Sequence, residues 1–215
     1  MKTILLKDAV ALIPDGASVM IGGFMGVGTP ERLVDELVRQ GKRKLTVIAN
    51  DNALPGIGIG KLISAGVVRK TIASHIGLNP ETQKKMLAGD LDVDLVPQGT
   101  LIERIRAGGF GLGGVLTPTG VGTVVEERKQ RIEVAGKPYL LETALRADFA
   151  LVQAFLADYI GNLYYALTAR NFNPVIAMAA DTVIVEADNI VPVGVIAPDQ
   201  VVTPAPVVDY IVSHA

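Results

Sequence analysis

The stretch Asp15-Gly-Ala-Ser-Val-Met-Ile-Gly-Gly-Phe-Met-Gly-Val-Gly-Thr-Pro30 carries the strongest structural signal in this chain of 215 residues. Ser18–Ile21 is a short apolar run typical of a strand, and a cluster of glycines follows it directly. Thr29-Pro30-Glu31 then predicts a helix with Thr29 as N-cap and Pro30 at its first position, and Gly41 is expected to end that helix. The stretch therefore predicts a strand, a glycine loop and a helix in succession.

A glycine loop between a strand and a helix can hold a ligand close to the backbone. The glycines are Gly22, Gly23, Gly26 and Gly28. Because they have no Cβ, a ligand could approach closely and meet free N–H groups. The spacing differs from the Gly-x-Gly-x-x-Gly pattern of dinucleotide-binding proteins, although Asp51 lies where a ribose-binding acid would be expected. A nicotinamide cofactor is therefore the less favoured alternative, and the absence of a following Gly-Lys-Ser/Thr excludes an NTPase phosphate loop.

The composition excludes several classes of protein. The formal net charge is −2, with 20 basic and 22 acidic residues, so no basic field indicates nucleic acid or an anionic membrane as a partner. The sequence contains no cysteine, which excludes disulfides and thiolate chemistry within the chain. No apolar run reaches the roughly 20 residues of a membrane span, and the first apolar segment is too short for a signal peptide. We therefore expect a cytoplasmic protein that binds neither nucleic acid nor membrane.

Apolar strands alternate with helices along the rest of the chain. Strands are expected at 45–50, 67–74, 91–96, 149–152 and 182–186, and helices at 7–13, 81–88, 100–107 and 175–180. This alternation predicts an α/β fold with a doubly wound, mostly parallel open sheet, formed by residues 1–215 as a single domain. The segments Arg131–Val134 and 139–142 predict a small antiparallel β-hairpin inserted into that fold.

Polar or glycine-rich residues follow four of the expected strands. They are Gly22 and Gly23 after the first strand, Asn50 after the second, Ser74 with Gly77 and Asn79 after the third, and Gln98 after the fourth. Since ligands of such sheets bind outside the carboxyl ends of the strands, we expect these groups to converge on one site. Gln98 is distinctive because it lies between a proline and a glycine and offers an amide with two N–H donors.

The remaining polar candidates favour structural roles. His75 and His214 lack a His or Glu at ligand spacing, so no metal site is expected. We expect His75 to be a loop-end residue with ordinary hydrogen bonds in preference to an acid–base catalyst, and His214 to lie in a disordered tail. Arg170 is expected to hold its loop to the sheet, with a carboxylate clamp as the alternative.

The opening stretch resembles the signature of the class I (3-oxoacid) coenzyme A transferases. The likeness continues through Asn50 and the segments 97–104, 106–109, 117–123 and 169–174, and is greatest to α subunits of the bacterial acetate/acetoacetate (butyrate) branch. It implies that CoA moves between a short-chain acyl-CoA (acetyl-, acetoacetyl- or butyryl-CoA) and a carboxylate acceptor, with acyl-CoA as substrate and no permanently bound cofactor. A 3-oxoadipate or succinate enzyme, a nicotinamide enzyme and a non-catalytic sugar-phosphate sensor stay open as alternatives.

The resemblance also implies an incomplete active site in this chain. The family's nucleophile is a glutamate in a Ser-Glu-Asn-Gly type motif on a β subunit, and that motif is missing here. The family therefore implies a β partner, in an α2β2 assembly, for which this chain provides Gln98 as an oxyanion donor and Asn50 to orient the substrate. The CoA-binding loop would consist of Gly22, Gly23, Phe24, Met25, Gly26, Val27 and Gly28. Phe110, where many relatives have a small residue, is expected to narrow the acyl pocket.

Overall fold

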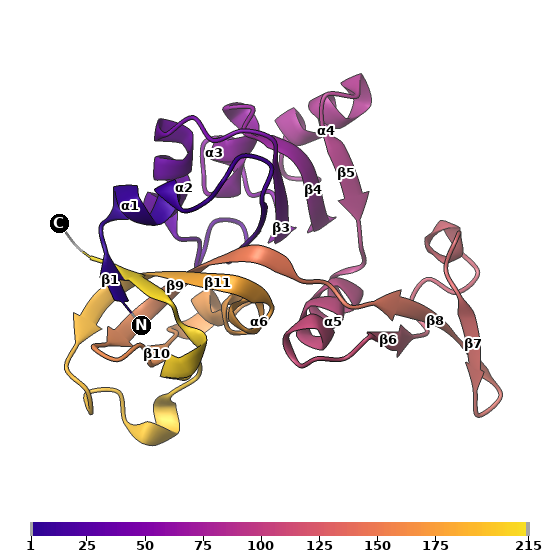
Figure 1. Ribbon diagram of the computed structural model, residues 1–215. Coiled ribbons are helices and arrows are strands. Elements are labelled where there is room, and N and C mark those ends of the chain that lie inside the picture. Colours follow the sequence, from indigo (N-terminus) through magenta and orange to yellow (C-terminus); the bar gives the residue numbers. More distant parts are fainter. Residues whose placement is uncertain (1, 214–215) are drawn as a thin grey trace.

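A nine-stranded sheet forms the body of the protein, and a three-stranded sheet projects from it as an arm (Figure 1). The structure is a computed structural model and describes residues 2–213. The strands are β1 (Lys2–Ile4), β2 (Ser18–Ile21), β3 (Leu45–Asp51), β4 (Val68–His75), β5 (Asp92–Leu95), β6 (Gly114–Thr117), β7 (Arg131–Val134), β8 (Lys137–Thr143), β9 (Ala147–Asp158), β10 (Leu163–Tyr164), β11 (Ala180–Val191) and β12 (Tyr210–Val212). The α-helices are α1 (Leu6–Ala11), α2 (Glu31–Arg39), α3 (Ile59–Ser64), α4 (Pro80–Ala88), α5 (Gln98–Gly109) and α6 (Asn173–Met178), and the 3-10 helices are η1 (Val124–Glu126), η2 (Leu167–Arg170), η3 (Pro198–Gln200) and η4 (Ala205–Val207).

The order of the strands places the glycine loop at the middle of the sheet. The order is β1-β12-β11-β9-β2-β3-β4-β5, with parallel neighbours throughout, and β10 pairs antiparallel with β9. The chain runs outward from β2 to β5 and returns as β9 on the other side of β2. The carboxyl end of β2 therefore lies where the strand order reverses, which is the usual ligand position in doubly wound folds. The expected α/β fold with a mostly parallel open sheet is confirmed.

Both faces of the central strands are buried, because side chains alternate along these strands between two apolar cores. In β2, Val19 and Ile21 join the core that packs against α1, α2 and α3, whereas Met20 joins the core on the opposite face. That second core contains Leu101 and Ile105 of α5 together with residues of α6. Figure 1 shows α1, α2, α3 and α4 on one side of the sheet and α5 and α6 on the other.

Several helices and strands differ in length from those expected from the sequence, and others were not expected. β9 and β11 are each twelve residues long, because the ladder between them continues beyond the apolar stretches that indicated them. α3 lies where a cluster of glycines suggested only a loop, and β1 and β12 at the edge of the sheet were not predicted. α5 begins at Gln98, two residues before its expected start, so Gln98 lies at the first turn of a helix and not in a connecting loop.

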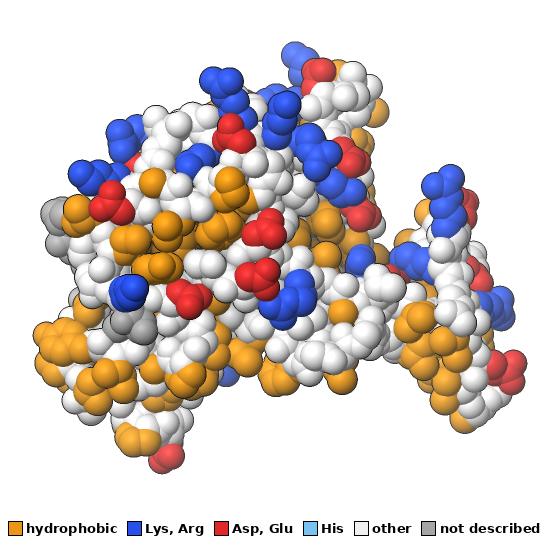
Figure 2. Space-filling view, viewed as in Figure 1, with side chains coloured by type: hydrophobic (Ala, Val, Ile, Leu, Met, Phe, Trp, Pro, Cys, Tyr) orange, Lys and Arg blue, Asp and Glu red, His pale blue; other side chains and the backbone are white. Residues whose placement is uncertain are grey.

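The arm contains the expected hairpin and one additional strand. β7 and β8 pair antiparallel, and β6 pairs with the other edge of β8. Ala135 and Gly136, with φ of 50° and 72°, form the two-residue turn that such hairpins prefer. At the base of the arm, the buried carboxylate of Glu142 accepts a hydrogen bond from Lys129 Nζ at 2.6 Å. Figure 2 shows hydrophobic side chains exposed on the arm, and Lys and Arg side chains gathered at the upper edge of the body.

The first turn of α2 is capped by a residue distant in sequence. The prediction of Thr29 as N-cap is wrong: Pro30 occupies that position and offers no side-chain acceptor. Instead, the carboxylate of Glu186 in β11 accepts hydrogen bonds from the backbone N–H groups of Arg32 at 3.2 Å and Leu33 at 2.9 Å. Glu186 thereby joins the helix that follows the glycine loop to the central strands of the sheet.

The titration of Glu186 yields a prediction about stability. Burial raises the pKa of Glu186 above its ordinary value of 4.5, although the N–H groups of Leu33 and Arg32 lower it. The folded protein therefore binds the proton of the Glu186 carboxyl group more tightly than the unfolded chain does. The stability that this proton contributes is complete below about pH 4.5 and is lost as the pH rises through the raised pKa. We expect the wild type to lose stability relative to Glu186→Gln between pH 4.5 and pH 7, as measured by urea unfolding. A stability difference that is equal at both pH values would contradict this expectation.

Candidate active site

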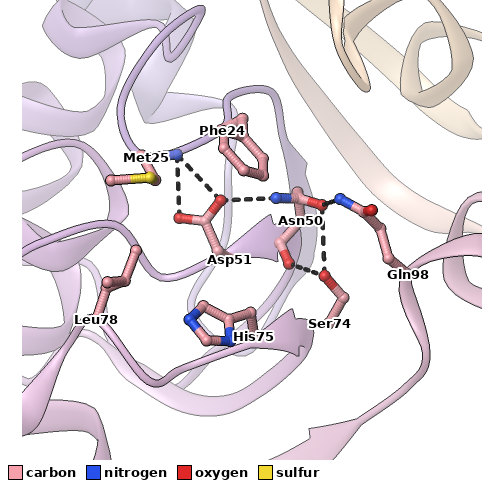
Figure 3. Close-up of a pocket in the computed structure, with 8 residues that line it drawn as sticks. All are labelled: Phe24, Met25, Asn50, Asp51, Ser74, His75, Leu78 and Gln98. Atoms are coloured by element: carbon pink, nitrogen blue, oxygen red, sulfur yellow. Dashed lines mark hydrogen bonds between the residues drawn. The ribbon is translucent and has the colours of Figure 1, made fainter.

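A pocket of about 280 Å³ lies at the carboxyl ends of β2, β3 and β4, beside the start of α5 (Figure 3). Its lining residues are Phe24, Met25, Asn50, Asp51, Ser74, His75, Leu78 and Gln98. Asn50, Ser74 and Gln98, named from the sequence at three strand ends, meet in this pocket, and the glycine loop joins them through Phe24 and Met25. Gly22 and Gly23, named at the first strand end, do not line it. We call this space the polar pocket, because five of its eight lining residues have polar side chains: Asn50, Asp51, Ser74, His75 and Gln98. Asn79 and Gly77 do not line it, and Asn79 instead caps α4 by accepting a hydrogen bond from Thr82 N.

A continuous chain of hydrogen bonds crosses the polar pocket from the glycine loop to α5 (Figure 3). The Asp51 carboxylate accepts from the backbone N–H of Met25 at 3.0 Å and of Ala53 at 2.7 Å. Asn50 Nδ2 donates to Asp51 Oδ2 at 2.7 Å, and Gln98 Nε2 donates to Asn50 Oδ1 at 2.5 Å. Ser74 Oγ donates to the backbone carbonyl of Asn50 at 2.7 Å, which fixes the end of β3.

The carboxylate of Asp51 determines how both amides are oriented. An ionised carboxylate can only accept hydrogen bonds, so Asn50 must turn its NH₂ group toward Asp51 and its oxygen toward Gln98. Gln98 must then donate through Nε2, and the second N–H of that group has no partner among residues 2–213. Since Asn50 is only 1% exposed, water cannot readily compete for its side chain. The pocket therefore presents one oriented N–H donor at Gln98.

The same carboxylate holds the tip of the glycine loop in a strained shape. Phe24 and Val27 exchange two backbone hydrogen bonds, at 3.0 and 2.9 Å, across a two-residue turn formed by Met25 and Gly26. Met25 has a φ of 51°, in the left-handed region that non-glycine residues rarely occupy. The two-residue geometry requires this conformation, and the bond from Met25 N–H to Asp51 stabilises it.

Most N–H groups of the glycine loop are bonded within the protein, contrary to the expectation that they are free. Gly22 donates to Leu151 O, Gly23 to Asn171 Oδ1, Phe24 to Val27 O, Met25 to Asp51 and Val27 to Phe24 O. The N–H groups of Gly26 and Gly28 have no partner within the described part of the chain. A ligand at the loop could therefore meet two backbone donors and not a complete row.

The glycines at the two ends of the loop are required by a close approach to the first residue of α6 and to the 3-10 helix η2 before it. A Cβ on Gly22 would lie 1.8 Å from Asn173 Oδ1, and a Cβ on Gly28 would lie 2.5 Å from the carbonyl oxygen of Ala169. Asn173 Nδ2 donates to Gly28 O at 2.9 Å and to Ala169 O at 2.8 Å. No local pattern in the sequence indicates these roles of Asn171 and Asn173, although segment 169–174, which carries part of the family resemblance, contains both residues.

This contact yields a prediction about the glycine loop. The Gly22→Ala variant must displace the buried side chain of Asn173, so we expect its free energy of unfolding to fall by about 1–3 kcal/mol. Gly113→Ala is the matched control, because a Cβ at Gly113 meets nothing within 4 Å, and we expect a change of at most about 0.5 kcal/mol. Urea unfolding of both variants tests this, and equal stability of the two would show that the contact carries no constraint.

A second pocket of about 330 Å³ adjoins the polar pocket and differs from it in character. Its lining residues are Phe24, Asn50, Gln98, Gly99, Ile102, Asn171 and Phe172. Phe24, Asn50 and Gln98 line both pockets, so the pair of amides lies at their common border. We call this second space the apolar pocket, because the side chains of Phe24, Ile102 and Phe172 provide its apolar walls.

The other residues singled out in the sequence do not join the hydrogen-bond chain that ends at Gln98. His75 is the last residue of β4, where its backbone pairs with Asp51, and it lines the polar pocket. The imidazole has no hydrogen-bond partner among residues 2–213, so the ordinary hydrogen bonds expected for this side chain are not found. Arg170 is exposed at the end of η2 and lines neither pocket, and His214 lies outside the described residues. Phe110 is 60% exposed at the far end of α5 and lines neither pocket, so its expected effect on the acyl pocket is not supported within this chain. Within residues 2–213, the structure contains no helix able to cross a membrane and no group of three His, Cys, Asp or Glu able to hold a metal ion.

The fold and the position of the two pockets are those of the doubly wound α/β proteins, which bind their ligands where the strand order of the parallel sheet reverses. The coenzyme A transferase family profile matches residues 3–214, and this chain belongs to that family. The chain is 59% identical over 211 residues to the acetate CoA-transferase subunit alpha of Escherichia coli (strain K12), covering 98% of this chain and 96% of the relative. It is 50% identical over 213 residues to the acetoacetyl-CoA:acetate/butyrate CoA transferase alpha subunit of Clostridium acetobutylicum, covering 99% and 98%.

A solved structure agrees at the level of the fold. An acyl-CoA transferase from Escherichia coli O157:H7, described as a thioester complex with CoA, superimposes with a TM-score of 0.87 at 23% identity. The match covers 99% of this chain and 47% of that one, so this chain spans about half of that protein. The chain is accordingly a CoA-transferase chain that corresponds to the alpha subunits of its curated relatives over nearly their whole length. The family expected from the sequence is confirmed.

Proposed function

We propose that this chain works as the α subunit of a cytoplasmic α2β2 CoA-transferase that moves CoA between a short-chain acyl-CoA and a carboxylate such as acetate, acetoacetate or butyrate. The names of the two curated relatives support this choice of substrates. The observation that carries the proposal is the oriented, unpartnered N–H of Gln98 at the border between two pockets. The glutamate nucleophile belongs to the proposed β subunit.

Each half of the transfer begins with a carboxylate adding to a carbonyl carbon. The glutamate oxygen of the β subunit bonds to the thioester carbon, and the carbon–sulfur bond breaks. The CoA thiolate departs, and an acyl-glutamyl anhydride remains on the β subunit. The thiolate then attacks the glutamyl carbonyl, which releases the donor's carboxylate and leaves a glutamyl-CoA thioester. The acceptor carboxylate reverses these steps, so no net proton or redox change is required.

Gln98 is suited to stabilise the charge that develops in the first step. Addition to the thioester places negative charge on the former carbonyl oxygen, and a donor that is already oriented stabilises that oxygen without reorganisation. Gln98 also begins α5, so the partial positive charge of the N-terminus of a twelve-residue helix lies beside its amide. Asn50 acts as a positioning residue, because both ends of its side chain are bonded to Asp51 and Gln98.

The glycine loop is proposed to receive the thioester end of CoA as a transient substrate. Residues 22–28 lie beside the donor, and Phe24 and Met25 line the polar pocket directly. The unpartnered N–H groups of Gly26 and Gly28 are the backbone donors available to the pantetheine amides. Binding along the remote part of CoA could then favour formation of the anhydride.

Replacing Gln98 tests the role of its amide. In the assembled enzyme we expect Gln98→Ala to lower kcat by roughly 100- to 1,000-fold, which is the usual cost of losing one oxyanion donor. The control Gln200→Ala replaces an exposed glutamine in η3 and should leave kcat unchanged. Steady-state kinetics and size-exclusion chromatography would separate catalysis from assembly, and an unchanged kcat in Gln98→Ala would remove the proposed role.

The requirement for a partner is tested by expression with and without a chain that carries a Ser-Glu-Asn-Gly motif. The isolated chain should show no transfer, because it lacks that motif, and the co-purified complex should be active. Borohydride should reduce a glutamyl thioester on the partner after incubation with acyl-CoA, which mass spectrometry would detect. Activity of the isolated chain would refute the division of roles.

A further inference from the structure

We propose that the apolar pocket binds the hydrocarbon tail of the acyl group, that Gly99 leaves room for that tail, and that Ile102 limits its length. This inference rests on the proposed CoA transfer and adds the location and chemical class of the acyl site. The ligand class is an uncharged acyl tail of a few carbons. The polar pocket would then be left for the sulfur side of the thioester.

The position of the amide pair supports this division. A thioester carbonyl carbon carries two substituents, the acyl tail and the sulfur, which leave it in different directions. If the carbonyl oxygen accepts the free N–H of Gln98, the two substituents extend from the border that Gln98, Asn50 and Phe24 form between the pockets. One pocket contains Asp51, Ser74 and His75, whereas the other contains Gly99, Ile102 and Phe172. The hydrocarbon tail would therefore enter the apolar pocket.

The first two turns of α5 provide one wall of the apolar pocket. Gln98 and Ile102 are four residues apart and Gly99 and Ile102 three, so all three lie on one face of the helix. Ile102 packs against the core beneath it, which fixes the depth of the wall. A Cβ on Gly99 would meet nothing within 4 Å, so the missing side chain leaves space that a ligand can occupy.

Asn171, the polar residue that the apolar pocket does not share with the polar pocket, has its hydrogen bonds satisfied within the protein. Asn171 Oδ1 accepts from Gly23 N at 3.1 Å and Phe172 N at 2.7 Å, and its Nδ2 donates to Val27 O at 2.9 Å and Thr168 O at 3.0 Å. None of the residues that line this pocket, all within the described part of the chain, is Lys, Arg or His. A second carboxylate on the acyl group would therefore lose its hydration without gaining a counter-charge. The pocket favours butyryl over succinyl tails.

The test uses the assembled enzyme with its β partner and propionate as the fixed acceptor. The donors are acetyl-, butyryl-, hexanoyl- and succinyl-CoA, and the measured quantity is kcat/KM for each. We expect Gly99→Val to lower kcat/KM for butyryl-CoA at least about 10-fold more than for acetyl-CoA, because the new side chain fills space needed by the longer tail. Ile102→Ala should raise the hexanoyl-to-butyryl ratio severalfold. In the wild type, succinyl-CoA should be the poorer donor compared with butyryl-CoA.

The control is Gly113→Val, an exposed glycine at the base of the arm where a Cβ also meets nothing within 4 Å. It should leave every ratio unchanged. An unchanged chain-length profile in both Gly99→Val and Ile102→Ala would overturn the proposal, as would succinyl-CoA used as well as butyryl-CoA. If Gly99→Val fails to assemble by size-exclusion chromatography, Ile102→Ala decides the question.

A separate binding measurement distinguishes failure of this inference from failure of the proposed function. Saturation-transfer NMR with butyrate reports contact of its methyl group with the assembled protein, whether or not transfer occurs. A methyl signal in the wild type and in Gly113→Val that is lost in Gly99→Val supports the pocket even if the wild type shows no CoA transfer. Equal signals in all three proteins overturn the pocket even if transfer is observed.

Discussion

The Asp51 carboxylate is the group on which the geometry of this site depends. It accepts a backbone N–H from Met25 at the tip of the glycine loop, and it accepts the side-chain amide of Asn50. Because a carboxylate cannot donate, each of these contacts has one possible direction, and that direction passes through Asn50 to Gln98. One acceptor thus fixes the left-handed turn of the loop and the orientation of the donor that faces the proposed thioester.

The topology explains why these groups meet. The strand order reverses beside β2, so the loop after β2, the end of β3 and the start of α5 come together although Phe24 and Gln98 are 74 positions apart in the sequence. The segment that contains Asn171 and Asn173 approaches from the other half of the sheet and bonds the same loop. Glu186 fixes the helix that follows. The loop is therefore held from three directions, which favours a preorganised site over one that forms on binding.

The sequence predicted the sheet and the convergence of strand ends, because periodicity and the position of Asn50 and Gln98 are local signals. It did not predict contacts that depend on tertiary structure. The cap from Glu186 joins residues more than 150 positions apart, and the N–H groups of the loop are used by Asp51 and Asn171, which no local pattern shows. Phe110 appeared relevant by family comparison, but the length of α5 places it at the far end of the helix.

The role of Gln98 as the donor to the thioester oxygen is tested most directly by a crystal structure of the assembled enzyme with a non-hydrolysable acyl-CoA analogue. We predict that Gln98 Nε2 lies about 2.7–3.1 Å from the oxygen that replaces the thioester carbonyl, and that its other N–H still donates to Asn50 Oδ1. The acyl tail should lie between Phe24 and Ile102. A structure in which that oxygen is bound elsewhere, or in which Gln98 has left Asn50 and turned away from the acyl carbon, would contradict it.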